Sequence, residues 1–315
     1  GSTYIYIAIR RPNKPPEAAT DVFDISSASD SGGLLTSTSV TTDYLITHAD
    51  NNSSGRWHFA RILGERGLRI DSTAALSGDL SSYWKMDKQT GFLKTGWNTS
   101  GTGTNYNFRR APGFFDVVVY TGGGSSQVTV SHNLGATPRL AFIKKTSESS
   151  YYGATVYYFG SSGNMFLNQN FSAGHGGSNG ISSVNSSTFK TKSGSTDTND
   201  NGETHVAFLF GSLDGISKVG TYSGTGSNVD VDCGFTSGAR FVMIKRTDST
   251  GDFYVYDTVR GIVSGNDPYQ ILNSDPAAVT NTDYIDPLSS GFTITSSAPA
   301  GLNASGGTYL FLAIA

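Results

Sequence analysis

One strand-like string recurs along the chain at nearly even intervals, and this recurrence constrains the fold more than any other feature of the sequence. Residues 307–314 read GTYLFLAI, and residues 2–9 read STYIYIAI. Between them lie ETHVAFLF at 203–210 and the looser TNYNFR at 104–109. The aligned threonines are Thr3, Thr104, Thr204 and Thr308, at intervals of 101, 100 and 104 residues. Such a period predicts three units of about a hundred residues, each long enough to form a core.

The composition favours β structure in these units. Hydrophobic residues make up 37% of the 315 residues and aromatic residues 12%, which is enough to form a buried core. Glycine is abundant, with 39 residues, and Glu17, Glu65, Glu148 and Glu203 are the only glutamates. Because strong helix formers are scarce and no segment holds a helical period, we expect an all-β fold.

The repeat also gives expected domain boundaries. Residues 1–9 are predicted to be the last strand of a preceding unit, and residues 10–19 form a Pro-rich linker that cannot donate a full ladder of hydrogen bonds. Three units then follow at residues 20–111, 112–212 and 213–315.

Short strands with frequent turn signals predict the architecture of each unit. Residues 139–146 match residues 240–247 at an offset of 101, and residues 44–47 and 56–60 are predicted to pair across a turn-rich loop. Phe92, Phe189 and Phe292 precede the recurring strand in the three units. We therefore expect tandem antiparallel β-sandwich units of jelly-roll or lectin-like character.

The charge pattern excludes some partners. The formal net charge is −3, which argues against a general nucleic-acid binder. Adjacent cations recur at Lys144-Lys145 and Lys245-Arg246, and we interpret them as solubility charges at strand ends that protect sheet edges. No apolar run approaches the roughly 20 residues of a membrane span, so membrane insertion is not expected. The single cysteine, Cys233, follows a strand-like alternation and is predicted to be a buried structural thiol.

Motifs that could carry chemistry are weak. Residues 176–180 fit G-x-S-x-G, but they lie in a Gly/Ser loop rather than in the strand-turn-helix that a nucleophile elbow needs. Residues 197–202 match the first half of a calcium loop, but Phe208 stands where the bidentate glutamate is expected, so a solvated turn is the preferred interpretation. The five histidines are scattered, and His205 aligns with Tyr309, so it is predicted to pack or pair across the sheet rather than to bind a ligand. We therefore predict no catalytic residue, no metal site and no cofactor.

Aromatic residues are the remaining candidates for a binding site. Rings can stack on sugar faces while their polar edges form hydrogen bonds, although aromatic strands also fill cores. We select Tyr151, Tyr152, Trp57 and His58 as candidate glycan-binding residues, with Tyr151 and Tyr152 favoured because they lie in a loop.

Several longer motifs together resemble a family of bacteriophage virion proteins of tail-fibre-like type, common among marine phages, over its C-terminal region. The motifs occupy residues 4–11, 107–118, 233–241, 259–269 and 302–309, and so extend over the whole chain. The resemblance implies a virion tail protein, extracellular in location, with a structural or adsorption role and a longer N-terminal region. It supplies no catalytic residue.

The resulting hypothesis is a non-enzymatic tail fibre or appendage protein that adsorbs to host cell-surface polysaccharide. Its expected partners are copies of itself, with a trimer expected from fibre proteins as a class, and other virion tail proteins. Weak sites on several repeats would add through avidity. The alternative is an extracellular filament or spacer subunit that assembles by strand addition through residues 1–9. A polysaccharide depolymerase is a weaker alternative, because the units share no pair of acidic residues.

Overall fold

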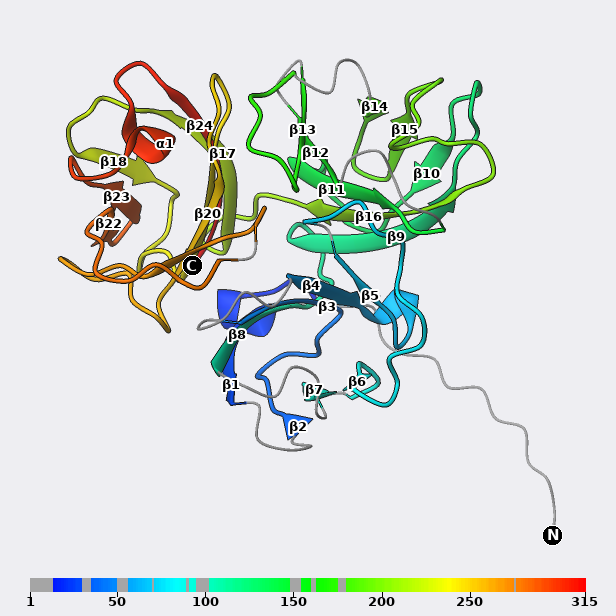
Figure 1. Ribbon diagram of the computed structural model, residues 1–315, viewed down its shortest axis with the longest axis horizontal. Coiled ribbons are helices and arrows are strands. Elements are labelled where there is room, and N and C mark those ends of the chain that lie inside the picture. The colour runs from blue at the N-terminus through cyan, green and yellow to red at the C-terminus, as the bar shows by residue number, and fades with distance from the viewer. Residues whose placement is uncertain are drawn as a thin grey trace, which may run out of the picture.

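In the part of the chain that the structure describes, the fold is built from three groups of eight strands. The computed structural model describes residues 14–29, 35–49, 56–69, 71–88, 91–94, 102–147, 154–159, 163–174, 180–274 and 276–315. Within these ranges almost all regular structure is β, which confirms the predicted fold class. The groups appear as three lobes, coloured blue to cyan, green, and yellow to red along the chain (Figure 1). We call them unit 1, unit 2 and unit 3.

The strands follow one another in the same sequence in every unit. Unit 1 contains η1 (Ala19–Asp21), β1 (Phe23–Ser29), β2 (Leu35–Thr36), β3 (Tyr44–Ala49), β4 (Trp57–Ala60), η2 (Arg61–Leu63), β5 (Gly67–Leu68), β6 (Trp84–Lys85), β7 (Phe92–Lys94) and β8 (Thr102–Phe108). Unit 2 contains β9 (Phe115–Thr121), β10 (Thr129–Ser131), β11 (Leu140–Lys145), β12 (Thr155–Tyr158), β13 (Asn164–Phe166), β14 (Ile181–Val184), β15 (Thr188–Thr191) and β16 (Thr204–Phe210). Unit 3 contains β17 (Ser217–Ser223), β18 (Val229–Asp232), β19 (Phe241–Arg246), β20 (Phe253–Asp257), β21 (Tyr269–Ile271), β22 (Ile285–Leu288), β23 (Gly291–Ile294), α1 (Ala300–Asn303) and β24 (Thr308–Ile314).

Each unit has the same two antiparallel sheets. The five-stranded sheets have the orders β1-β8-β3-β4-β5, β9-β16-β11-β12-β13 and β17-β24-β19-β20-β21. The three-stranded sheets have the orders β2-β7-β6, β10-β15-β14 and β18-β23-β22. The first strand pairs with the eighth and the second with the seventh, a nested pairing of the jelly-roll kind. This sheet order could not be read from the sequence.

The recurring strand is the eighth strand of each unit and lies inside the five-stranded sheet. Phe210 pairs with Leu140 and Ile314 pairs with Phe241, as Phe108 pairs with Tyr44. Counting back from these pairs, the partner of Thr204 and Thr308 in unit 1 is Thr102, so the predicted alignment on Thr104 was wrong by two residues. A shift of two residues keeps every side chain on the same face, so the alternation in the sequence could not reveal the error.

Other local predictions are confirmed. β3 and β4 pair antiparallel, with Leu45 opposite Phe59. β11 and β19 begin at Leu140 and Phe241, which matches the predicted offset of 101 residues. Phe92, Phe189 and Phe292 all lie on the seventh strand. Residues 1–9 and the start of the predicted linker lie outside the described residues.

Each unit buries a core between its two sheets. In unit 2 this core joins Ala141, Ile143 and Leu209 of the larger sheet to Val130 and Phe189 of the smaller one. In unit 1 the rings of Phe59 and Trp84 stack across the sheets at a centroid distance of 4.4 Å, and Phe92 packs against Trp84. Each unit is therefore a two-layer sandwich, as expected.

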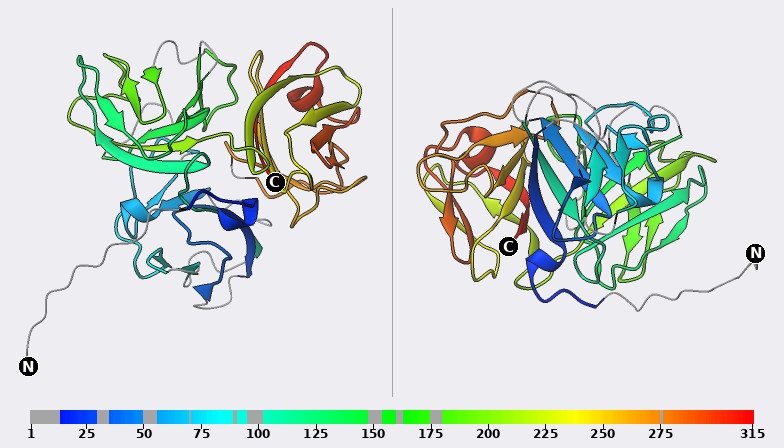
Figure 2. Two further views of the ribbon diagram at one scale, coloured as in Figure 1. Left: turned by 180° about the vertical axis from the view of Figure 1, so that it is seen from behind. Right: turned by 90° about the horizontal axis from the view of Figure 1, so that it is seen from below.

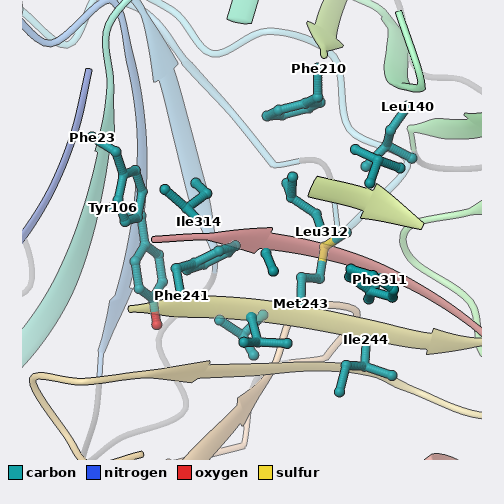
Figure 3. Close-up of a cluster of buried hydrophobic side chains, with 14 of the residues drawn as sticks. Phe23, Tyr106, Leu140, Phe210, Phe241, Met243, Ile244, Phe311, Leu312 and Ile314 are labelled. Atoms are coloured by element: carbon teal, nitrogen blue, oxygen red, sulfur yellow. The ribbon is translucent and has the colours of Figure 1, made fainter. Parts of the chain in front are cut away.

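The opposite faces of the three larger sheets pack against one another. Figure 3 shows Tyr106 and Phe23 of unit 1, Leu140 and Phe210 of unit 2, and Phe241, Met243 and Leu312 of unit 3 converging in one cluster. The rings leave a void of only about 10 Å³, lined by residues from all three units. This size is at the lower limit for one water molecule.

The larger sheets are consequently covered on both faces. All residues of β16 and β24 after the first are buried, although a sandwich with one solvated face would alternate. Two further views show the three units grouped around this common centre (Figure 2). The continuous apolar runs of the recurring strand are therefore explained by contacts between units.

Candidate functional site

Equivalent residues connect the units in a closed cycle. His48, Lys144 and Lys245 occupy the same position in β3, β11 and β19, and all three are buried. Lys144 Nζ donates to Ser72 O of unit 1 at 2.8 Å, and Lys245 Nζ donates to Phe171 O of unit 2 at 2.8 Å. His48 Nδ1 bonds Gln270 Oε1 of unit 3. Each unit thus contacts another through the same strand, and the third contact closes the ring.

We call these contacts the 1/2, 2/3 and 3/1 junctions. Backbone hydrogen bonds support the correspondence: Leu76 N donates to Thr146 O across the 1/2 junction, and Ala173 N donates to Thr247 O across the 2/3 junction. Their lengths are 3.0 and 2.8 Å. The first two junctions therefore repeat in geometry as well as in residue type.

The interpretation of the paired cations as solubility charges is wrong for the lysines. Lys144 and Lys245 are fully buried, and Lys145 is 5% exposed. Burial lowers the pKa of Lys144 and of Lys245 to about 8. Four backbone carbonyl oxygens surround Lys245 Nζ at 2.7 to 3.3 Å and share its three N–H protons, which compensates for its lost hydration. These ammonium groups are structural connectors between units.

A denser polar network occupies the 3/1 junction. Tyr106 Oη donates to Asp257 Oδ2 at 2.8 Å and accepts from Arg260 at 2.7 Å. Arg260 also pairs with the fully buried Asp257 at 2.6 Å. Arg56 of unit 1 donates to the carbonyl oxygens of Ile271, Ser274 and Pro276 of unit 3. The charges in this junction are thus engaged with one another and with backbone groups.

Two neutral histidines lie in the same network. Burial and the nearby Arg56, His58 and Arg260 lower the pKa of His48 well below its usual value. Burial and Arg56 do the same for the pKa of His58, whose Nδ1 bonds Tyr44 Oη at 2.6 Å. The Nε2 atoms of both rings are buried without a hydrogen-bond partner in the described part of the chain. Protonation of either ring would place a new charge beside existing cations.

An open groove at the 1/2 junction is the best candidate for a ligand site. Its volume is about 520 Å³, within the usual range for ligand sites. Unit 1 contributes Ile62, Leu63, Arg66 and Leu76, and unit 2 contributes Val119, Thr146, Ser147 and Thr204. Ile62 is 46% exposed and Val119 is 38% exposed, so two of the exposed large apolar side chains of the described residues meet here.

The polar groups of the groove lie on both walls. Arg66 Nε donates to Ser77 O at 2.8 Å, and among the described residues its two terminal nitrogens have no hydrogen-bond acceptor. On the opposite wall Ser147 Oγ accepts from Thr204 N at 3.1 Å and donates to the Glu203 carboxylate. The groove therefore combines aliphatic walls, hydroxyl groups and one guanidinium with free donors.

Comparison with known families places the chain in one of them. The family model for a domain of unknown function, DUF7483, matches residues 84–315, from the sixth strand of unit 1 to the end of the chain. The chain belongs to the DUF7483 family. No curated protein matches it significantly. The family match covers units 2 and 3 and includes the unit 2 wall of the groove, whereas the unit 1 wall precedes it.

Of the four residues selected from the sequence, the structure of this DUF7483 protein describes Trp57 and His58, and it does not bring these two into one site. Tyr151 and Tyr152 lie outside the described residues. Trp57 and His58 are neighbours on β4, so their side chains point to opposite faces. Trp57 packs beside Phe59 between the sheets, and His58 is fully buried towards the shared core. His58 therefore has no surface with which to contact a glycan.

The turn at residues 197–202 is solvated only in part: its first three residues are buried, whereas Asn201 and Gly202 are exposed. Asn199 is fully buried; its Oδ1 accepts from Gly123 N, and its Nδ2 donates to the carbonyl oxygens of Gly124 and Ser126. Asp200 pairs with Lys145 at 2.9 Å. The Asn199 Oδ1 and Asp200 Oδ2 oxygens are thus engaged within the protein. Across the described ranges, no group of His, Cys, Asp and Glu side chains could hold a metal ion.

Two other residues behave as predicted. His205 pairs with Tyr120 across the sheet and stacks on it at 5.2 Å, as Tyr309 stacks on Tyr222 at 4.9 Å. Cys233 is buried, and burial raises the pKa of its thiol to about 12. The G-x-S-x-G loop, apart from Gly180, lies outside the described residues.

Neither the groove nor the burial of the lysines was predicted from the sequence. The recurrence of Lys144 and Lys245 in otherwise apolar strands was a usable signal, because a charge inside such a strand must find a partner. The groove left no such signal, because its walls come from different units. The helices of the described residues are single turns, and none is long or apolar enough to cross a membrane.

Proposed function

We propose that this chain is a non-enzymatic structural protein of a bacteriophage virion, part of a tail fibre or appendage, which adsorbs to a glycan on the host surface. The likeness of its motifs to phage tail proteins supports the virion assignment. The groove at the 1/2 junction is the observation that carries the binding role.

The chemistry of the groove suits a sugar. Sugars present both C–H faces and hydroxyl groups, and the groove offers Ile62 and Val119 beside Thr146 and Thr204. The free donors of Arg66 can bond two oxygens of a ligand. A ligand of one or two sugar units fits the volume of about 520 Å³.

The same proposal includes assembly with copies of the chain and with other tail proteins. A trimer is the expectation for fibre proteins, and several weak sites on one particle would then bind through avidity. Light scattering of the purified chain tests this point: a stable trimer supports the assembly, and a stable monomer refutes it.

The binding role is tested on intact bacteria and on a glycan array. We expect saturable binding that falls at least tenfold when the groove is blocked by Val119→Arg, because a long cation then occupies it. The matched control is Thr221→Arg, at the equivalent position of β17 in unit 3. The variant Tyr151→Ala with Tyr152→Ala tests whether these loop residues add to binding.

The rival functions predict different results in the same assay. Release of reducing ends from host polysaccharide would indicate a depolymerase. Absence of binding to every cell and glycan would contradict adsorption and favour the filament or spacer.

A further inference from the structure

The equivalent position at the 2/3 junction shows what is particular about the groove. Val119 of β9 corresponds to Thr221 of β17, because both lie opposite the third residue of the eighth strand. Ser147 corresponds to Asp248: Ser147 Oγ accepts from Thr204 N, and Asp248 Oδ1 accepts from Thr308 N at 2.9 Å. The isopropyl group of Val119 in the groove is thus replaced by the hydroxyl-bearing side chain of Thr221 at the 2/3 junction. The hydroxyl of Ser147 is replaced by the carboxylate of Asp248.

Charge at the 2/3 junction is already neutralised. Arg246 donates to both oxygens of Asp248, at 3.1 and 3.0 Å. In the groove, by contrast, the described neighbours leave the terminal nitrogens of Arg66 without an acceptor. At these two positions the groove is therefore the more apolar and the less charged of the two sites.

The lining of the groove is aliphatic. Ile62, Leu63, Leu76 and Val119 form its apolar part, and among the described residues its lining includes no aromatic ring. A bare pyranose ring is commonly held by stacking on an aromatic face, which this lining does not offer. A methyl group, in contrast, packs well against branched aliphatic side chains.

We propose that the groove binds sugars that carry an acyl group, such as N-acetylated amino sugars, more tightly than sugars that lack the acyl group. The acetyl methyl group packs between Ile62 and Val119, and the acetyl carbonyl oxygen accepts from Arg66. The hydroxyl oxygens of Thr146 and Ser147, whose protons go to Thr204 O and to the Glu203 carboxylate, accept from the ring hydroxyls. This inference rests on the proposed adsorption function and names its ligand class.

The charged side chains near the groove favour a neutral ligand over an anionic one. The Glu203 carboxylate lies beside Ser147, so the groove holds an acidic group near one wall and Arg66 on the other. A strongly anionic ligand would meet Glu203, whereas a neutral acetamido group bonds to either wall without repulsion. The two opposite charges therefore favour a neutral, polar substituent.

The test compares two probes that differ only in the acetamido group. Binding of chito-oligosaccharides and of cello-oligosaccharides of equal length is measured by calorimetry with the full chain. We expect the N-acetylated probe to bind about tenfold more tightly, since one well-packed apolar group gives discrimination of that order. Equal affinity for the two probes would refute the inference.

The variants are designed from the repeat. Val119→Thr installs the residue of the equivalent position and keeps the branched shape of the side chain, so the fold is expected to persist. It should reduce the preference for the N-acetylated probe to less than about threefold. Arg66→Gln should weaken binding of the same probe roughly tenfold. Thr221→Val, the reverse change in unit 3, should leave the affinities for the N-acetylated and the non-acetylated probe unchanged.

The outcomes separate this inference from the adsorption function. If the chain binds bacteria but neither oligosaccharide, or if Val119→Thr keeps the full preference, the inference fails while adsorption stands. If the chain binds neither bacteria nor any glycan, both fail. A preference for the N-acetylated probe that is lost in Val119→Thr and kept in Thr221→Val supports both.

Discussion

Lys144 and Lys245 occupy the same position in two successive units, and each donates its ammonium protons to backbone carbonyls of the unit before it. His48 takes this position in unit 1 and bonds Gln270 of unit 3. Three units that repeat in the sequence therefore form a ring in space, and a buried polar contact joins each pair.

Replacement of Lys245 tests whether the ammonium stabilises the 2/3 junction. Lys245→Met keeps much of the side-chain volume but leaves four carbonyl oxygens without this donor. We expect the free energy of unfolding to fall by about 3 kcal/mol, as measured by urea denaturation. The exposed Lys218→Met is the control and should change it by less than about 0.5 kcal/mol. A Lys245→Met variant as stable as the parent would contradict a structural role.

The buried lysines predict a rise in stability with alkaline pH. The pKa values of Lys144 and Lys245 are about 8 in the folded chain, below the ordinary 10.5. Between these values the unfolded chain binds more protons than the folded chain, so the free energy of unfolding increases with pH. The increase is at most about 1.4 kcal/mol per pH unit for each lysine.

This effect is measured between pH 8 and 10. Above pH 10 the buried tyrosines oppose it, since burial raises the pKa of Tyr44, Tyr222 and Tyr256. Urea midpoints of the parent and of Lys144→Met with Lys245→Met are compared across the window. The parent should gain stability relative to the variant as the pH rises; parallel curves would show that the lysines titrate normally.

Acid should weaken the 3/1 junction. The pKa of His48 lies well below 6.5 in the folded chain because of burial and of Arg56, His58 and Arg260. Below pH 6.5 the unfolded chain binds a proton that the folded chain excludes, so the free energy of unfolding decreases as the pH falls. His58 adds to this decrease, as does His205, whose folded pKa is about 4.

The variant His48→Gln isolates the contribution of the junction. Glutamine can still bond Gln270 but does not titrate. Between pH 6.5 and 5 its stability should fall less steeply than that of the parent, as measured by urea midpoints. Limited proteolysis at pH 5 should cleave unit 1 of the parent first. Equal slopes for the two proteins would show that His48 does not couple pH to stability.

The hydroxyl of Tyr106 is expected to stabilise the same junction. It bonds both Asp257 and Arg260, and the ring itself packs against Phe241 at 5.0 Å. Tyr106→Phe keeps the ring and removes the two hydrogen bonds, at a cost of about 1 to 3 kcal/mol in thermal or urea unfolding. Tyr83→Phe, at an exposed tyrosine, is the matched control. If Tyr106→Phe left the free energy of unfolding unchanged, Asp257 and Arg260 would compensate fully for the lost hydroxyl by bonding each other.

Much of the fold could be predicted because the strands and turns are determined by residues that are close together in the sequence. Strand propensity and turns gave the β class, and the repeat gave the matching third strands at Leu140 and Phe241. The register predicted in unit 1 was wrong because Thr102 and Thr104 are two positions apart on β8, and a shift of two positions preserves the alternation along a strand. The choice of His58 was wrong for a different reason: Trp57 and His58 were chosen as aromatic residues, and nothing in their own strand indicates that both faces of its sheet are covered. Tyr151 and Tyr152 stay a prediction, because they lie outside the described residues.

The sequence by itself determined the strands, their repetition and the apolar character of the recurring strand, because these depend on neighbours within a few residues. The tertiary structure alone decided that three sandwiches share one core, that Lys144 and Lys245 are buried, and that a groove opens between η2 and β9. These features arise where distant segments meet, as His48 meets Gln270 across 222 residues. Whether an apolar face packs within its own unit or against another unit depends on how the three units close into a ring. No pattern within a few residues of the sequence predicts that arrangement.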